Sequence, residues 1–155
     1  MSDTVHRYAA TCVWAGSTAA GYDTYERVHT AIAPPAEATL ALSSDPAFRG
    51  DARLLNPEAL LVLSASSCQL LSFLAVAARA RVDVVDYRDD AEGEMPEAVR
   101  PMRITRIVLR PQITVRGKVD PARLEHLVEV AHRECFIANS LATDVVVEAT
   151  FHAAP

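Results

Sequence analysis

The sequence predicts an α+β fold in a single domain over residues 1–155, and three observations agree on this. Short β-rich runs fill residues 1–50, a long apolar helix is expected over 56–80, and residues 82–152 return to a β-β-α-β order. Strands and helices therefore come in blocks, whereas a doubly wound fold alternates them regularly. Half of the residues are apolar, so a chain of this length has enough apolar surface to build one core.

The N-terminal part is expected to form a small sheet. Residues 5–14 and 24–33 are β-rich and alternate loosely, and the segment 15–21 between them has the glycine, serine and alanine composition of a flexible turn. These two runs predict a hairpin. A pair of prolines ends the second run, and residues 38–42 are expected to add a short third strand.

The long central helix has a clear start in the sequence. Asn56 is a good N-cap, Pro57 fits the first helical position, and Glu58 complements the positive end of the helix dipole. We expect the helix to end at Arg79 or Ala80. Its leucines lie on several faces, so one sheet and one further helix are too little to cover it, which predicts a partner chain and an intertwined homodimer.

The C-terminal part predicts two strands, a helix and a last strand. Residues 82–88 and 104–115 have the composition of strands, and the acidic segment 89–100 between them is expected to be a loop. An Asp-Pro pair caps a second helix, which carries apolar residues at helical spacing and ends near Cys135. A β-branched run over 144–150 closes the pattern.

Composition and charge exclude several partners. The net charge of -5 is spread along the chain, which leaves no basic footprint for nucleic acid and no polybasic patch for a membrane surface. Residues 59–78 carry no charge and are long enough to cross a bilayer, but the polar side chains at their centre favour the buried helix of a soluble protein. Residues 1–7 lack the order of a signal peptide, so we expect a cytoplasmic protein.

Three scattered cysteines do not form the dense framework of a small secreted domain. Cys12 lies in a strand beside apolar residues and is expected to be a small buried hydrophobe. Cys68 differs, because serines and a glutamine flank it on a helix that otherwise excludes polar groups. Its reactive form is the thiolate, which apolar surroundings disfavour and the distant helix dipole does not support, so an arginine from elsewhere is required. Cys135 either attacks an oxidised Cys68 or only fills a core position.

Several motifs together closely resemble the osmotically inducible protein C and organic hydroperoxide resistance (OsmC/Ohr) family. The matching features are the Asn-Pro-Glu-Ala-Leu helix start at 56–60, the apolar run into Cys68, and Cys135 ahead of Asn-Ser-Leu at 139–141. The order of elements matches over nearly the whole chain. The resemblance implies an OsmC-like fold, with antiparallel sheets wrapped around two central helices, and an intertwined homodimer whose active sites lie at the subunit interface.

The resemblance also implies a thiol-dependent peroxidase. In this family a cysteine at the position of Cys68 attacks an organic or inorganic hydroperoxide, and an arginine, which falls on Arg27 here, stabilises the thiolate. Glu58 would hold that arginine by a bidentate pair, and Cys135 would resolve the sulfenic acid as a disulfide. An external thiol then reduces the disulfide, and no metal or organic cofactor takes part.

The apolar composition of the central helix bears on the substrate. Apolar side chains of the central helix, with Leu61, Leu71 and Phe73 among them, are expected to favour organic hydroperoxides.

The sequence departs from the family pattern at two places. The hairpin lacks the usual glycine and arginine richness, and Phe136 stands where a proline often follows the second cysteine.

Other functions remain open from the residues alone. A non-catalytic, small-ligand-binding protein can use the same fold. A metal site would draw on His126, His132, Cys135 and Cys68, although His126 falls on a different side of its helix from His132. A hydrolase with His29 or His132 as base lacks the glycine signature of a nucleophile elbow.

Overall fold

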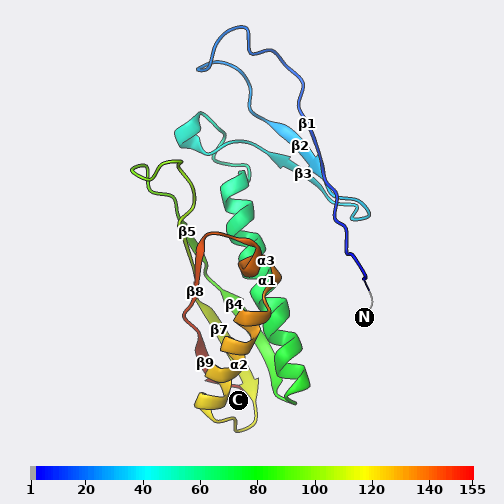
Figure 1. Ribbon diagram of the computed structural model, residues 1–155, viewed down its shortest axis with the longest axis vertical. Coiled ribbons are helices and arrows are strands. Elements are labelled where there is room, and N and C mark those ends of the chain that lie inside the picture. Colours follow the sequence, from blue (N-terminus) through cyan, green and yellow to red (C-terminus); the bar gives the residue numbers. More distant parts are fainter. Residues whose placement is uncertain (1–2) are drawn as a thin grey trace. The chain divides into compact units, whose positions relative to one another are not determined.

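The computed structural model describes residues 3–155 and has the α+β fold that the sequence predicts (Figure 1). The chain forms two compact units, one within residues 1–60 and one over residues 61–155. The expected N-terminal sheet falls in the first unit, and only residues 1 and 2 of its range lie outside the described part. The expectation of one domain stays a prediction.

The first unit is built on a three-stranded antiparallel sheet in the order β1-β2-β3, followed by the short 3-10 helix η1. The two hairpin strands are shorter than the sequence predicts. The Glu26 carboxylate accepts hydrogen bonds from the backbone N–H groups of Arg27 and Val28, at 2.8 and 2.9 Å, so these groups have a partner outside the β ladder. The elements are β1 (Thr11–Val13), β2 (His29–Ile32), β3 (Thr39–Leu42) and η1 (Pro46–Phe48).

The long helix α1 spans Pro57–Arg79, which confirms the predicted bounds. The side chain of Asn56 accepts a hydrogen bond from the backbone N–H of Ala59 at 2.7 Å, as an N-cap does. One face of the helix is buried, and it carries residues at helical spacing: Ala65, Gln69, Phe73, Val76 and Ala77. The opposite face leaves three leucines open to solvent in the single chain: Leu63, Leu71 and Leu74.

The second unit contains two three-stranded sheets, in the orders β4-β7-β9 and β5-β6-β8. The pairs β4–β7 and β5–β6 are antiparallel, whereas β6–β8 and β7–β9 are parallel. The sheets are therefore mixed rather than purely antiparallel as expected. Their strands are β4 (Asp83–Asp89), β5 (Glu92–Glu94), β6 (Arg106–Leu109), β7 (Pro111–Arg116), β8 (Asp144–Val147) and β9 (Thr150–Ala153).

Three sequence-based expectations differ from this arrangement. The segment expected as one strand over 104–115 is two strands in different sheets, which separate at Arg110. The backbone N–H of Arg110 donates to the Asp89 carboxylate at 2.6 Å, so it leaves the β ladder at this point. The run expected as one last strand over 144–150 divides in the same way, and the expected acidic loop contains β5.

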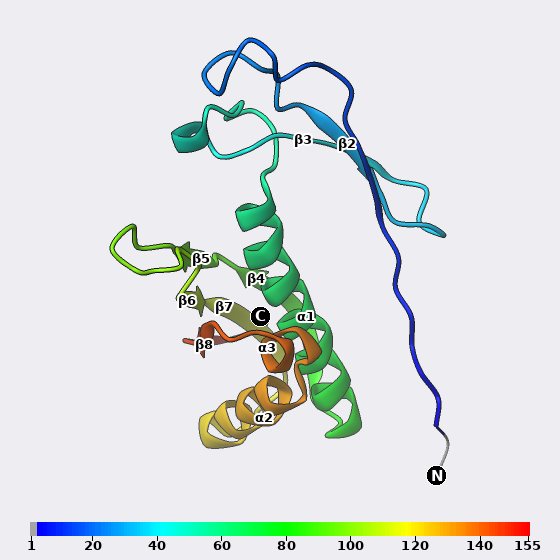
Figure 2. The ribbon, with the colours of Figure 1, turned by 45° about the horizontal axis from the view of Figure 1, so that its top comes forward.

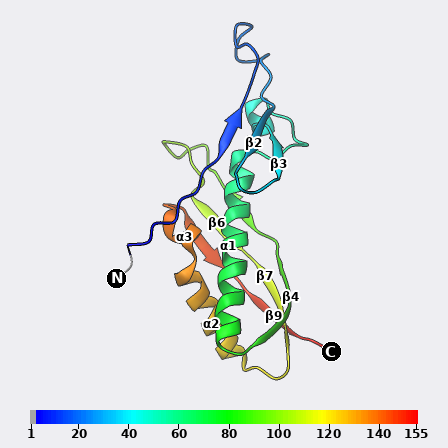
Figure 3. The same ribbon diagram turned by 90° about the vertical axis from the view of Figure 1, so that its right-hand side faces the viewer.

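Two shorter helices complete the second unit, α2 (Pro121–Glu134) and α3 (Phe136–Ser140). The Asp120 side chain caps α2 by accepting a hydrogen bond from the N–H of Ala122 at 3.0 Å. Figures 2 and 3 show α2 beside α1. The buried cluster between these elements joins residues of α1, β7 and α2: Phe73, Val76, Ala77, Ile113, Val115, Leu124, Leu127, Val128 and Ala131.

Helix α1 has the length and composition to cross a membrane, because its most apolar window has a mean hydropathy of 2.0. In this structure 22% of that window is buried. The core helix of a soluble protein passes the same test. The apolar side chains of its open face need a cover, because exposed apolar patches of this kind mark contact with a partner or a lipid.

Candidate functional site

The second unit brings together two cysteines that lie far apart in the sequence. Cys68 is in the middle of α1 and is partly exposed, whereas Cys135 lies between α2 and α3 and is 1% exposed. Both are free thiols, and they lie near enough to each other for Cys68 to raise the pKa of Cys135. One thiol is therefore open to solvent, while the second lies near it inside the protein.

A groove of 550 Å³ leads to Cys68. Its α1 side repeats every third or fourth residue, as one helix face does, and its other side comes from the end of α2 and from α3. An ion pair of 2.6 Å between Arg79 and Glu134 lies in its wall. The lining residues are Cys68, Leu71, Ser72, Ala75, Arg79, Arg133, Glu134, Phe136 and Asn139.

Only one of the three apolar residues predicted to line the site is found in the lining of the groove. Leu71 lines it, but Phe73 has no exposed surface and belongs to the core on the other side of α1. Leu61 packs against the second buried cluster of this unit. The expectation for Phe73 and Leu61 was wrong because an apolar helix gives no sign in its sequence of which apolar face meets its own sheet.

The surroundings of Cys135 keep its thiol protonated. Burial raises the pKa of this thiol, and the contact with Cys68 raises it further, while the backbone N–H groups of Ala138 and Ile137 act in the opposite direction. Cys135 therefore rests as a neutral thiol, which must lose its proton before its sulfur can act as a nucleophile.

The raised pKa of Cys135 predicts a loss of stability at alkaline pH. The ordinary pKa of this thiol is about 9, so above this pH the unfolded chain releases a proton that the folded unit still holds. The free energy of unfolding should fall as the pH rises through about 9, and Cys135→Ala should flatten that decline. Thermal unfolding from pH about 7 to about 10 measures both slopes. Equal slopes in the two proteins would contradict this assignment.

Arg27 lies in the first unit, just before β2, and is 8% exposed. Its guanidinium donates hydrogen bonds to the backbone carbonyls of Tyr25 and Tyr22, at 2.7 and 2.5 Å. The guanidinium carbon also stands over both rings, 3.9 Å from the Tyr25 centroid and 4.8 Å from that of Tyr22. This arrangement holds a buried positive charge rigidly in place.

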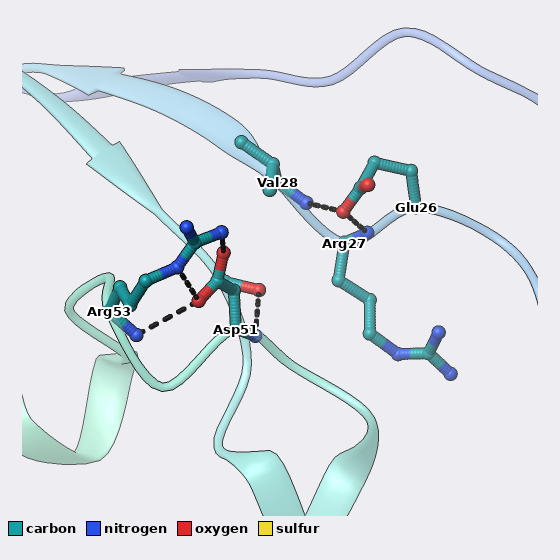
Figure 4. A network of polar contacts seen from close by, with 6 residues as sticks. Glu26, Arg27, Val28, Asp51 and Arg53 are labelled. Carbon is teal, nitrogen blue, oxygen red and sulfur yellow. Dashed lines mark hydrogen bonds and ion pairs between the residues drawn. The ribbon is translucent and has the colours of Figure 1, made fainter.

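Among the described residues, no carboxylate forms an ion pair with Arg27. Figure 4 shows its guanidinium pointing away from the Glu26 carboxylate, which is occupied by backbone N–H groups, and away from Asp51, which is paired with Arg53. A buried cation without a counter-ion is costly, so it is suited to binding an anion.

Arg27 lines a pocket of 340 Å³ within the first unit. The Trp14 indole N–H donates to the Glu26 carbonyl at 2.7 Å, and its ring meets that of Tyr25 edge-on at 6.4 Å. The pocket therefore combines fixed aromatic walls with one buried positive charge. Its lining residues are Trp14, Thr18, Tyr25, Arg27, His29, Ser43, Ser44 and Pro57.

The remaining candidates are placed as follows. Glu58 is half-buried in the first turn of α1, and an Arg27–Glu58 ion pair is not formed within residues 3–155, so its role stays a prediction. Cys12 is exposed on β1, and its expected burial was wrong because the short sheet leaves this strand uncovered. A cluster of three or more side chains able to hold a metal ion is absent from the described part of the chain.

Sequence reasoning missed part of the lining. Counting in steps of three and four from Cys68 leads to Ser72, Ala75 and Arg79, so the α1 side of the groove could have been predicted from helix periodicity. The other side comes from Arg133 and Phe136, whose approach depends on how α2 and α3 pack on α1.

Comparisons with known proteins agree with this fold. The family model described as OsmC-like protein matches residues 50–150. An OsmC-like protein of unknown function from Vibrio cholerae is 30% identical, with a TM-score of 0.85 over 94% of this chain and 100% of that chain. A search of curated proteins found no match.

Two structures of organic hydroperoxide resistance proteins share the fold at lower identity. The protein from Elizabethkingia anophelis is 15% identical, with a TM-score of 0.71 over 99% of this chain and 100% of that chain. OhrB of Bacillus subtilis is also 15% identical, with a TM-score of 0.60 over 95% of this chain and 98% of that chain. At this identity the likeness concerns the fold alone.

Proposed function

Because this chain belongs to the OsmC-like family, we propose that it is a thiol-dependent peroxidase that reduces organic hydroperoxides, with Cys68 as the attacking thiol and Cys135 as the resolving thiol. The contact between a partly exposed cysteine at the groove and a fully buried second cysteine carries this proposal. Some family members of the same fold are named hydroperoxide resistance proteins, which supports the reaction class.

The reaction has two chemical steps before reduction. The Cys68 thiolate attacks the terminal oxygen of the hydroperoxide, an S–O bond forms as the O–O bond breaks, and the alkoxide leaves as an alcohol after taking a proton. Cys135 then attacks the sulfur of the sulfenic acid, an S–S bond forms, and the hydroxyl leaves as water. An external thiol reductant supplies the two electrons that reopen the disulfide.

Arg27 and Glu58 complete the proposed site. A thiolate and a developing alkoxide both need positive charge and hydrogen-bond donors, and Arg27 is a buried cation that lacks a carboxylate partner within the described residues. We propose that Arg27 serves the Cys68 thiolate and that Glu58 holds the guanidinium in the assembled protein.

The assembled protein is proposed to be a homodimer in the reducing cytosol. The open face of α1 exposes Leu63 by 54% and Leu71 by 64%, and Phe136 beside the groove is 78% exposed. A second copy of this chain would bury these side chains and remove apolar surface from water. A reducing compartment keeps both thiols ready for the next cycle.

The oxidation stoichiometry tests the proposed function. Reduced protein should lose two free thiols and two hydrogens in mass after one equivalent of cumene hydroperoxide. The Cys135→Ser variant should lose only one thiol and stop at a sulfenic or over-oxidised Cys68, because the resolving sulfur is gone. If both proteins keep all of their thiols, the peroxidase proposal is wrong.

A non-catalytic ligand-binding protein is the second candidate, and the pocket around Arg27 favours it. A buried cation between aromatic walls suits a small organic anion. In that case the same oxidation experiment should show no rapid thiol loss, and an anion should raise the thermal unfolding temperature of the wild type but not of Arg27→Met.

A further inference from the structure

His29 lines the same pocket as Arg27, and one side of its ring is held by the backbone. It is the first residue of β2, and its Nδ1 atom lies 2.9 Å from the backbone carbonyl oxygen of Arg27. A carbonyl oxygen can only accept a hydrogen bond, so Nδ1 must carry the proton of this bond. The place of this proton decides what the other ring nitrogen can do.

The second ring nitrogen of His29, Nε2, has a free electron pair when the ring is neutral. No further hydrogen bond of this ring is formed within residues 3–155. Because Nδ1 faces the backbone, Nε2 lies on the opposite side of the ring. His29 therefore gives the pocket an acceptor that can also take up a proton, as imidazole groups do near neutral pH.

Ser43 adds a hydrogen-bond donor to the same pocket. It follows β3, is 1% exposed, and its hydroxyl oxygen accepts a hydrogen bond from the backbone N–H of Asp51 at 3.1 Å. Within the described part of the chain, the proton of this hydroxyl has no acceptor. A buried donor without an acceptor is unfavourable, so the Ser43 hydroxyl favours a ligand oxygen beside it.

Arg27 supplies the positive charge of the pocket and further donors. Among residues 3–155, its guanidinium donates only to the backbone carbonyls of Tyr25 and Tyr22, which leaves other N–H groups of the fork without an acceptor. A planar carboxylate matches the geometry of a planar guanidinium better than a spherical anion does. The pocket thus offers two kinds of donor for an oxyanion and one acceptor for a proton.

We propose that this pocket binds a small carboxylic acid with an apolar, ring-shaped body, and that the acid and a proton bind together. The carboxylate oxygens accept from Arg27 and Ser43, and Nε2 of His29 holds the proton. The ring packs against Trp14 and Tyr25, and a volume of 340 Å³, at the small end of ligand pockets, limits the body to about one ring. This inference goes beyond the peroxidase function and does not depend on it.

The uptake of a proton follows from the chemistry of the ligand. A carboxylate has only acceptor atoms, so an unprotonated Nε2 of His29 beside it would place two electron pairs against each other. A nearby negative charge favours the charged form of an imidazole. The acid therefore arrives as a carboxylate, an N–H bond forms at Nε2 with a proton from the acid or from the buffer, and the new N–H group donates to the ligand.

Other titratable groups near the pocket are placed so that His29 is the proton acceptor. Those in the lining, next to it in the chain or bonded to it are Tyr25, Glu26, Arg27, Asp45, Asp51 and Glu58. Phenols and guanidinium groups already hold their protons near neutral pH. Glu26 and Asp45 accept backbone N–H groups, and hydrogen bonds from Arg53 lower the pKa of Asp51 to about 2. Glu58 is the remaining carboxylate, which the experiment must exclude.

Proton uptake on binding tests the inference, with benzoate as the probe. The full chain carries Cys12→Ser and Cys68→Ser, so that no thiolate competes for Arg27 and neither thiol takes up a proton. Calorimetric titrations at pH about 8, in buffers with different heats of ionisation, give the number of protons gained. Benzoate should bind with an uptake of about one proton per chain, because the imidazole is largely neutral before binding at this pH. Benzamide, which has no charge, should bind at least about tenfold more weakly and without proton uptake.

His29→Asn is the deciding variant, because the asparagine amide can keep the bond to the Arg27 carbonyl while Nε2 is lost. It should abolish proton uptake and weaken benzoate binding about tenfold, as expected for the loss of one charged hydrogen bond. His6→Asn is the matched control, since His6 is exposed in the same unit, and it should bind as the parent does. Ser43→Ala should weaken binding about fivefold and keep the proton uptake.

Three results would overturn the inference. They are an absence of benzoate binding up to about 10 mM, binding without proton uptake, and unchanged uptake in His29→Asn, which would move the proton to another group such as Glu58. If His29→Asn does not fold, the uptake by the parent and its persistence in Ser43→Ala and Glu58→Gln decide. These titrations use no peroxide and lack Cys68, so their failure leaves the peroxidase proposal standing, and a failure of that proposal leaves them unchanged.

Discussion

Replacing Cys68 by serine should abolish hydroperoxide turnover, with a loss of at least about a thousandfold in kcat/KM, because removal of a catalytic nucleophile leaves only binding. A serine hydroxyl keeps the size of the side chain, but it is a far weaker nucleophile than a thiolate at neutral pH. The measurement is the consumption of cumene hydroperoxide with a dithiol as reductant. Cys68 is partly exposed, so the variant should fold as the wild type does.

Cys12→Ser is the matched control for this prediction. Cys12 is a free and exposed cysteine on β1, and its replacement should leave turnover within about twofold, as is usual for surface changes. If Cys68→Ser keeps turnover and adding Cys12→Ser to it removes that turnover, the attacking thiol is Cys12 in the first unit. This result would contradict the proposed site.

Replacing Arg27 by methionine should lower kcat/KM by about a hundredfold, the effect expected when a preorganised donor of charge is removed. Methionine keeps much of the apolar stem, whereas it supplies neither charge nor donors. The kcat/KM of Arg27→Lys should lie between those of Arg27→Met and the wild type. An ammonium restores the charge, but it lacks the planar fork that reaches the Tyr22 and Tyr25 carbonyls.

The control for Arg27 is Arg53→Gln in the same unit. Arg53 is highly exposed and is paired with Asp51 at 2.7 Å, so its loss should change turnover little. The rate of Cys68 alkylation against pH gives a second readout, since loss of Arg27 should move the half-maximal rate to higher pH. If the alkylation profile and turnover are unchanged in Arg27→Met, another cation activates Cys68, and Arg133 in the groove is the first to replace.

Much of the fold follows from local signals in the sequence. The capping residue Asn56 and the charged residue Arg79 bound the long helix at the positions where the structure begins and ends it. Asp120 and Pro121 mark the start of α2 in the same way. These signals work because an N-cap and the first helical turn involve only neighbouring residues.

The parts that sequence reasoning missed depend on distant partners. The break at Arg110 exists because its backbone N–H meets Asp89, a residue of another strand, and because its guanidinium pairs with Glu92 and Glu148. The sequence on both sides of the break is rich in β-branched residues, so it predicts one continuous strand. The parallel pairings of β8 and β9 likewise need the crossover through α2 and α3.

The candidate site shows the same division. The resemblance predicted Cys68 and Cys135 as a pair, and the two thiols lie near enough for Cys68 to raise the pKa of Cys135, while their roles stay a prediction. The wall of the groove that comes from Arg133 and Phe136 was not predicted, because a nearly all-apolar helix does not reveal which of its faces meets α2 and α3.

The parallel pairing of β8 and β9 also affects how the protein is made. Both strands come after Cys135 in the chain, and both complete sheets whose other strands are made much earlier. The core of the second unit therefore closes only after these strands leave the ribosome, since non-local pairing waits for its last segment. Until then the Cys135 thiol of a nascent chain is open to oxidants, and cells under peroxide stress should produce a larger share of wrongly oxidised protein during synthesis than after it.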